Sequence, residues 1–263
     1  MPTDKPLDNP ASIKGLLVDL SGVVHQGDAA VPGSRDALVR LRDAGLPVRF
    51  VSNTSRKTCD LLYRQLHELG FDIERDQLFT APVAARQYYQ QHAMPILALV
   101  HESLRPEFDA LQLTDDPAEA RAVLVGDAAE GFSYTAMNLA FRALQEGAEL
   151  HAIARNRYFR DGDRLSLDAG AFVAALEYAS GRTAQLFGKP ATAFFEQAVA
   201  SLGLAADDVL MVGDDVEADV NGALDAGLQA VLVRTGKYQA GDDDRNRGSC
   251  LADLQAVTHS LLD

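Results

Sequence analysis

Short apolar runs alternate with helical patterns in the first and last thirds of the chain. The runs at 13–20 and 48–51 are each followed by leucines and alanines at helical spacing, which stop at Gly45 and Gly70. The same order returns around the apolar runs at 185–187, 209–212 and 228–233. Because parallel strands need long crossover connections, this order predicts an α/β fold with a doubly wound, Rossmann-like parallel sheet.

The middle of the chain has strands and helices of its own. Apolar runs at 96–100, 123–125 and 150–154 alternate with helical patterns at 134–145 and 169–179. We predict an α/β domain inserted at 82–184, so that residues 1–81 and 185–263 form one discontinuous domain. The polar leader at 1–10 is expected to be mobile, and the polar stretch at 239–249 to be an exposed loop.

Polar side chains follow three of the predicted strands directly. These clusters are Asp19 with Ser21, then Ser52 with Asn53 and Thr54, and lastly Asp214 with Asp215 and Asp219. In an open parallel sheet the carboxyl ends of the strands share one edge, where ligands bind. Lys189, framed by Gly188 and Pro190, precedes a late helix. We therefore expect these distant segments to form one site.

These residue types suit phosphoryl transfer assisted by a metal. A carboxylate can attack phosphorus, hydroxyl and amide groups can bind phosphoryl oxygens, and a fixed ammonium can neutralise both partners. Mg²⁺ prefers carboxylate oxygens together with substrate phosphate. Each cluster alone also fits a turn, a helix cap or a surface lysine. A cap would not need three carboxylates within six residues, whereas the second Gly-Asp pair, at 126–127, fits a simple turn.

Composition excludes several other classes of function. The formal net charge is −14, from 38 acidic and 24 basic side chains, which opposes binding to nucleic acid or to anionic membranes. Two cysteines and no apolar run of about 18 residues indicate a reduced, cytoplasmic protein without a membrane span. Lysine is scarce, with 5 residues against 27 aspartates, so a framed Lys189 stands out.

The ordered set of motifs resembles the haloacid dehalogenase-like (HAD) hydrolase superfamily. The motifs are DLSGVV, SNT, FGKP and MVGDD, and the insert between SNT and FGKP is similar to the class IIA arrangement with an α/β cap. The resemblance implies Mg²⁺-dependent hydrolysis of a small phosphorylated compound through an aspartyl phosphate. A homodimer formed through the cap also fits this resemblance.

The resemblance also assigns roles to individual residues. Asp19 would be the nucleophile and a Mg²⁺ ligand, the backbone carbonyl of Ser21 a second ligand, and Asp214 a third. Ser52 and Asn53 would bind the phosphoryl group, and Lys189 would orient it. The residues themselves add Thr54 to the phosphoryl-binding set, and Asp215 and Asp219 would either lie just outside the direct metal ligands or hold Lys189 in place.

Ser21 departs from the superfamily pattern, in which a second aspartate acts as general acid and base. Because a serine hydroxyl is a poor acid at neutral pH, substrates whose leaving group needs little protonation should be favoured. Pyrophosphate, acyl phosphates and P–N bonds are of this kind. His25 could supply the missing proton, although a histidine that only lines the surface or the substrate is the commoner case.

Other functions remain open on the sequence alone. Ser21 is compatible with a regulatory protein that keeps a phosphate pocket but turns over slowly, and a phosphotransferase would use the same residues. A dehalogenase fits less well, because Lys189 and the carboxylate cluster imply metal-bound phosphate.

Overall fold

The chain forms two units in the computed structural model, which describes residues 4–161 and 164–263. Residues 1–52, 63–79 and 189–263 belong to the first unit, and residues 53–62 and 80–188 to the second. The segment expected as an insert, 82–184, falls within the second unit.

A six-stranded sheet organises the first unit. Its strands, in spatial order, are β14 (Ser249–Leu251), β13 (Gln229–Val233), β12 (Val209–Gly213), β1 (Gly15–Asp19), β4 (Val48–Ser52) and β5 (Leu78–Thr80). The registered pairs from β14 through β4 are all parallel. Every residue of β1 and β12 is buried, as expected for central strands that are covered on both faces. The predicted parallel α/β fold is thus confirmed.

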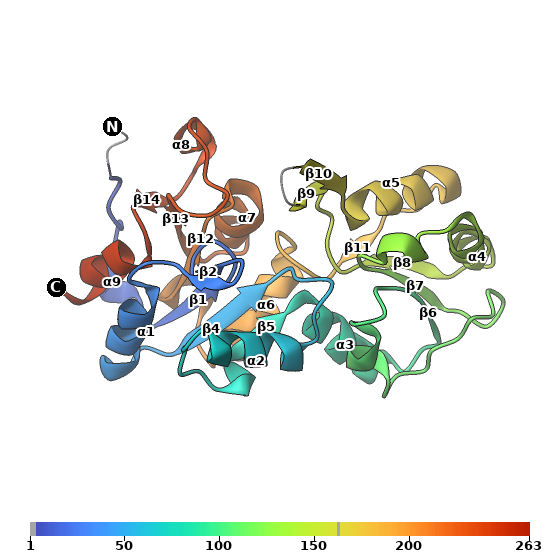
Figure 1. The fold of residues 1–263 in the computed structure, drawn as a ribbon, viewed down its shortest axis with the longest axis horizontal. Helices are drawn as coiled ribbons and strands as arrows, with labels where there is room; N and C mark the ends of the chain where they lie inside the picture. Colours follow the sequence, from blue (N-terminus) through green and yellow to red (C-terminus); the bar gives the residue numbers. More distant parts are fainter. Residues whose placement is uncertain (1–3, 162–163) are drawn as a thin grey trace. The chain divides into compact units, whose positions relative to one another are not determined.

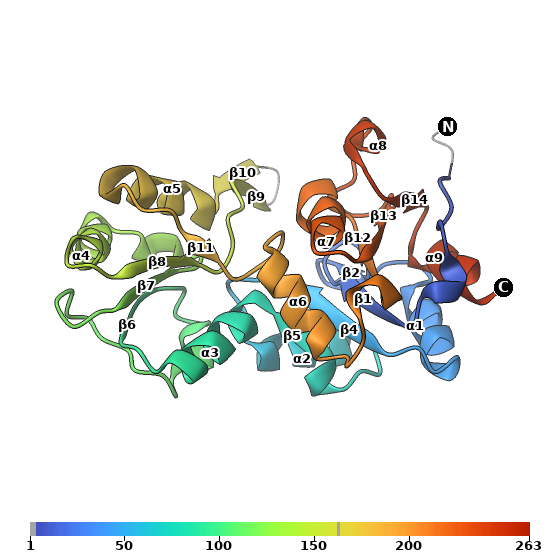
Figure 2. The same ribbon diagram turned by 180° about the vertical axis from the view of Figure 1, so that it is seen from behind.

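Helices lie on both faces of this sheet, with α1 towards the viewer in Figure 1 and α6 towards the viewer in Figure 2. The helices of the first unit are α1 (Ser34–Asp43), α6 (Thr192–Ala200), α7 (Gly222–Asp225), α8 (Asp242–Arg245) and α9 (Leu254–Leu262), and α2 (Cys59–Glu68) spans both units. A π-helical turn at Val216–Asn221 leads into α7. Within the described residues, no helix is long and apolar enough to cross a membrane.

A small antiparallel hairpin follows the central strand. It consists of β2 (His25–Gln26) and β3 (Ala29–Ala30), and it comes between β1 and α1 in the chain. The Ser34 hydroxyl, at the start of α1, is buried and donates a hydrogen bond to the Val24 carbonyl at 2.9 Å. This bond ties the hairpin to the helix that follows it.

The second unit has a separate parallel sheet and core. Its sheet runs in the order β11 (Gln185–Leu186), β8 (Glu149–Ala152), β7 (Ala122–Val125) and β6 (Ile96–Leu99). Its helices are α3 (Ala81–His92), α4 (Tyr134–Gln145) and α5 (Ala169–Ser180), and β9 (Tyr158–Asp161) pairs antiparallel with β10 (Arg164–Leu167). Val125, Ala140 and Val173, from β7, α4 and α5, are fully buried and belong to one cluster. Its apolar sheet residues and the inward faces of its helices thus give this unit a core of its own.

One expectation for a polar segment is wrong, and a second holds in part, because residues 239–247 are mostly exposed but include a short helix. Residues 1–3 lie outside the described part, but the rest of the leader is attached to the sheet. Lys5 exchanges two backbone hydrogen bonds with Cys250 of β14, both 2.8 Å long, and Leu7 is buried. The stretch at 239–249 contains α8, whose Asp242 is buried and accepts hydrogen bonds from the Gln239 N–H and the Arg245 side chain. Side-chain and backbone pairing therefore orders segments that composition alone marks as polar loops.

Candidate active site

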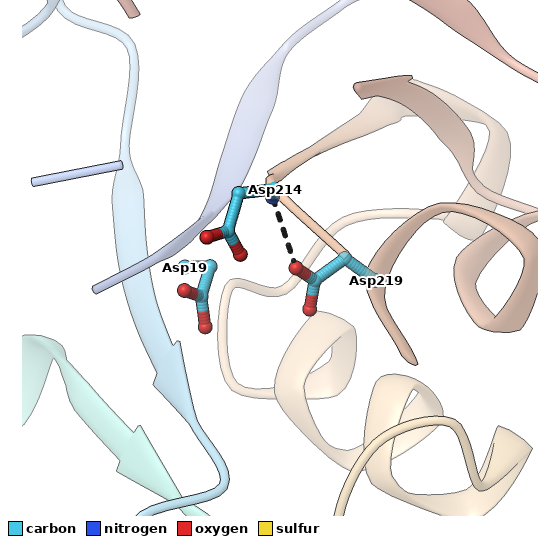
Figure 3. Close-up of side chains that lie close together, drawn as sticks. All are labelled: Asp19, Asp214 and Asp219. Atoms are coloured by element: carbon cyan, nitrogen blue, oxygen red, sulfur yellow. Dashed lines mark hydrogen bonds between the residues drawn. The ribbon is translucent and has the colours of Figure 1, made fainter. Parts of the chain in front are cut away.

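Three buried aspartates gather at the carboxyl ends of the two central strands (Figure 3). Asp19 is the last residue of β1, and Asp214 directly follows β12, which pairs with β1 through Val18 and Val212. Asp219 reaches the same place from the π-helical turn. One oxygen from each carboxylate lies within 4.8 Å of the others. The sheet topology thus joins the first strand of the chain to residues almost 200 positions later.

Lys189 lies between two of these carboxylates. Its ammonium donates a hydrogen bond to Asp19 Oδ1 and lies 2.6 Å from Asp219 Oδ1. The Lys189 side chain is only 3% exposed. Burial by itself would lower the pKa of Lys189, but the negative charges of Asp19 and Asp219 outweigh it and raise the pKa. Lys189 is therefore a fixed positive charge inside the cluster.

Asp219 holds the loop that carries Asp214. Its Oδ2 accepts the backbone N–H groups of Asp214 and Asp215, each at 3.1 Å, while Oδ1 faces Lys189. Asp215 in turn caps the π-helical turn by accepting the N–H groups of Glu217 and Ala218. Because both Asp219 oxygens are engaged, Asp19 and Asp214 are the better candidates to hold a metal.

Two glycines and one backbone amide hold the Asp214 carboxylate in place. The Lys237 N–H donates to Asp214 Oδ2 at 2.7 Å. A Cβ atom at Gly22 would fall 2.0 Å from that oxygen, and one at Gly236 would fall 1.9 Å from it. Both glycines also have positive φ, +94° and +59°. No side chain fits at either position unless Asp214 moves.

The cluster fits a divalent cation. Three buried carboxylates face one buried ammonium, which leaves an excess of two negative charges that one divalent ion would cancel. The crowding of negative charge also appears in the raised pKa values of Asp214 and Asp219. Burial raises the pKa of Asp214 to about 8, and the charges of Asp19 and Asp219 add to the rise. Burial likewise raises the pKa of Asp219 to about 6, although Lys189 opposes it.

Ser21 and His25 follow Asp19 closely in the chain, with Ser21 in the turn after β1 and His25 at the start of the hairpin. The Ser21 side chain is exposed, and the residue forms an isolated β-bridge with His25. His25 is buried, and its Nδ1 donates to the Gly27 carbonyl at 3.0 Å, so that this ring nitrogen carries the proton. His25 thus stabilises its own turn. A role as proton donor to a leaving group would have to come from Nε2.

The phosphate-binding candidates are divided between the two units. Ser52 is buried at the end of β4, beside β1, in whose register Asp19 pairs with Val51. Ser52 therefore ends on the same sheet edge as Asp19. Asn53 and Thr54 belong to the second unit, so only Ser52 is placed alongside the aspartates.

Sequence reasoning missed Lys237. It follows β13, the next strand beyond β12, and therefore reaches the same sheet edge as Asp214. Its Nζ lies 3.3 Å from Asp215 Oδ2, and its side chain is 61% exposed. The strand-end rule that found Asp19 and Asp214 applies equally to the end of β13 and could have found it.

Replacing Gly236 with alanine should weaken metal binding. The added methyl group would displace Asp214, and misplaced groups around a metal site typically cost about 10–100-fold in affinity. We expect Mg²⁺ affinity of the Gly236→Ala variant, measured by titration calorimetry, to fall at least about tenfold. Gly203→Ala is the control, because Gly203 also has positive φ (+70°) but nothing lies within 4 Å of the added atom. Equal losses in both variants would contradict this account of Asp214.

Metal-free protein should lose stability as pH rises. Since the pKa of Asp214 is raised to about 8 by folding, the native state holds a proton that the unfolded state has released above pH 4. The free energy of unfolding should therefore fall between about pH 4 and 8, by up to about 1.4 kcal/mol per pH unit for this one proton. In Asp214→Asn this decline should be smaller, so the variant becomes more stable than wild type at pH 8.

Denaturant unfolding in chelator at pH 5, 6.5 and 8 measures this difference. Asp225→Asn, which changes an exposed carboxylate, should follow the wild-type curve. If Asp214→Asn does the same, the buried carboxylate carries no such penalty.

The chain was compared with known proteins. Models for haloacid dehalogenase-like hydrolases match residues 16–114 and 186–260. The chain is similar to haloacid dehalogenase-like hydrolase domain-containing protein 2 of Bos taurus, with 44% identity over 250 residues and 95% of each chain covered. It is also similar to the phospholysine phosphohistidine inorganic pyrophosphate phosphatase of Danio rerio, with 39% identity over 272 aligned positions, 100% of this chain and 99% of that protein.

Among solved structures, a p-nitrophenyl phosphatase from Archaeoglobus fulgidus superposes with a TM-score of 0.88 at 25% identity. The match covers 98% of this chain and 100% of that one. The chain therefore belongs to the haloacid dehalogenase-like hydrolase family of enzymes.

Proposed function

We propose that this hydrolase is a Mg²⁺-dependent phosphatase that forms an aspartyl phosphate on Asp19. The observation that carries the proposal is the buried cluster in which Asp19 contacts Lys189 and lies within reach of Asp214. The phosphatase names of similar proteins support the same class of reaction. The substrate is a small phosphorylated compound.

Asp19 supplies the nucleophile. One carboxylate oxygen attacks phosphorus, the bond from phosphorus to the leaving group breaks, and water later cleaves the acyl phosphate to restore the carboxylate. Lys189 orients Asp19 through their contact, and its positive charge lowers the repulsion between the carboxylate and the phosphoryl oxygens. Mg²⁺ held by Asp19 and Asp214 would supply further charge neutralisation at the phosphoryl group.

Ser21 and the second unit bear on substrate choice. Ser21 offers no acid for the leaving group, which favours phosphoanhydrides, acyl phosphates and P–N bonds over alkyl esters. The second unit, 53–62 and 80–188, is proposed to act as a cap that selects the substrate and excludes water. Ser52, Asn53 and Thr54 would bind the transferred phosphoryl group.

Asp19→Asn should abolish turnover. An amide cannot form the covalent intermediate, so kcat should fall at least about a thousandfold on p-nitrophenyl phosphate with Mg²⁺. Wild type should lose activity in chelator and recover it with added Mg²⁺, while Asp225→Asn behaves like wild type. A phosphatase assay and mass spectrometry of the acid-quenched enzyme measure both rate and intermediate.

The alternatives give different results in the same assay. A regulatory phosphate-binding protein would bind phosphate or a fluoride mimic without turnover, and a phosphotransferase would need an added acceptor. Retained activity in Asp19→Asn would rule out the aspartyl phosphate.

Restoring a carboxylate at position 21 should broaden the substrate range. Ser21→Asp adds a group that can protonate an alkoxide leaving group, so turnover of alkyl phosphates should rise by about 100-fold, the low end of the range for general acid catalysis. Pyrophosphate turnover should change much less. Ser21→Asn, similar in shape but without an acid, is the matched control. Wild type that already prefers alkyl esters to pyrophosphate would contradict the role assigned to Ser21.

A further inference from the structure

Lys237 contributes two different groups to the candidate site. Its backbone N–H binds Asp214 Oδ2 at 2.7 Å, which places this residue next to a proposed metal ligand. Its ammonium extends towards solvent, and the Lys237 side chain is 61% exposed. One residue thus supports the buried carboxylate and presents a cation to solvent beside it.

Lys189 cannot act in the same way. Its side chain is 3% exposed and lies between Asp19 and Asp219, so its positive charge acts inside the cluster. A leaving group departs on the side of phosphorus opposite the attacking Asp19 oxygen, because displacement at phosphorus is in line. A cation for that group has to come from elsewhere, and Lys237 is an exposed ammonium already at this edge of the sheet.

The contact with Asp215 does not account for the Lys237 side chain. Asp215 already caps the π-helical turn through its Oδ1, at 3.2 Å from Glu217 N and 3.0 Å from Ala218 N. The Lys237 ammonium lies 3.3 Å from the other oxygen, and an exposed pair of this kind contributes about 0–1 kcal/mol. The contact with Asp215 orients the Lys237 ammonium and contributes little to stability. The other N–H groups of the ammonium can still donate hydrogen bonds to a ligand.

We propose that the Lys237 ammonium binds the leaving group of the substrate, and that this leaving group is anionic, such as the second phosphate of a phosphoanhydride. The inference rests on the proposed function and names a specificity-determining residue for it. An ammonium stabilises the charge that appears on the departing oxygen, and it therefore replaces protonation in a site where Ser21 provides no acid.

The first step balances without a proton from the protein. The Asp19 carboxylate attacks one phosphorus of HP₂O₇³⁻, the bond from that phosphorus to the bridging oxygen breaks, and its electron pair leaves with HPO₄²⁻. The product on Asp19 is a dianionic acyl phosphate. Water then cleaves it to the carboxylate, HPO₄²⁻ and one released proton. An alkyl ester lacks both the second charge and the proton, so Lys237 has no anionic group to bind before the reaction and the departing alkoxide still needs a proton.

The test compares two substrates in Lys237→Gln and Lys237→Arg. The backbone amide that supports Asp214 is unchanged in both variants. We expect Lys237→Gln to lower kcat/KM for pyrophosphate relative to p-nitrophenyl phosphate by about tenfold or more, which is the loss of one hydrogen bond to a charged group. Because the ammonium binds the second phosphate in the bound substrate and also stabilises the charge on the departing oxygen, the loss should appear both in kcat and in KM, with a weaker Ki of pyrophosphate as a competitive inhibitor. Lys237→Arg should restore most of the selectivity.

Lys14→Gln is the matched control. Lys14 also forms an exposed pair with an aspartate, Asp208, but it precedes β1 and lies at the opposite edge of the sheet. This variant should keep the wild-type selectivity.

The outcomes separate the two proposals. Equal losses on both substrates in Lys237→Gln would show a merely structural role and overturn the inference, as would unchanged selectivity and Ki. Both results leave the phosphatase proposal standing. Wild type without Mg²⁺-dependent turnover of either substrate would overturn the phosphatase proposal and this inference with it.

Discussion

The structure depends on a charge imbalance buried at the centre of the first unit. Asp19, Asp214 and Asp219 share a small volume with Lys189, and burial makes every uncompensated charge there costly. Much of the nearby sequence serves this arrangement. Asp219 accepts hydrogen bonds from the backbone of the Asp214 loop, and Asp215 caps the following turn. Gly22 and Gly236 leave room for the Asp214 carboxylate, because a side chain at either position would collide with it. A divalent cation would complete the balance, so that metal binding, folding and the proposed catalysis would draw on the same excess charge.

Hydrophobic periodicity was sufficient to predict the fold, because its strands are buried on both faces. The ends of the apolar runs that predicted β1, β4 and β12 lie within two residues of the ends of the observed strands. The site followed from one topological fact, that parallel strands end at a common edge. It points to the ends of β1, β4 and β12, where carboxylates and hydroxyls follow a strand, and equally to the end of β13, whose loop carries Lys237.

Other features could not be predicted because they depend on partners distant in sequence. Gly22 and Gly236 look like ordinary turn residues until the Asp214 carboxylate is placed between them. Asp127 fits a turn in the sequence, yet in the second unit its buried carboxylate binds Arg56, which also lies over the ring of Phe159 at 4.8 Å. Periodicity reports which face of an element is buried, whereas pairing between loops requires coordinates.

The position of β1 in the sheet has a consequence for synthesis of the chain. One neighbour, β4, follows after a single helix, but the other, β12, is among the last strands to leave the ribosome. Until then β1, whose residues are all buried in the finished sheet, has one edge without its native partner. An apolar strand with an open edge is a template for pairing with other chains. The discontinuous first unit therefore leaves one edge of this buried strand open while the second unit is being made, and the nascent chain is most prone to pair with other chains at that stage.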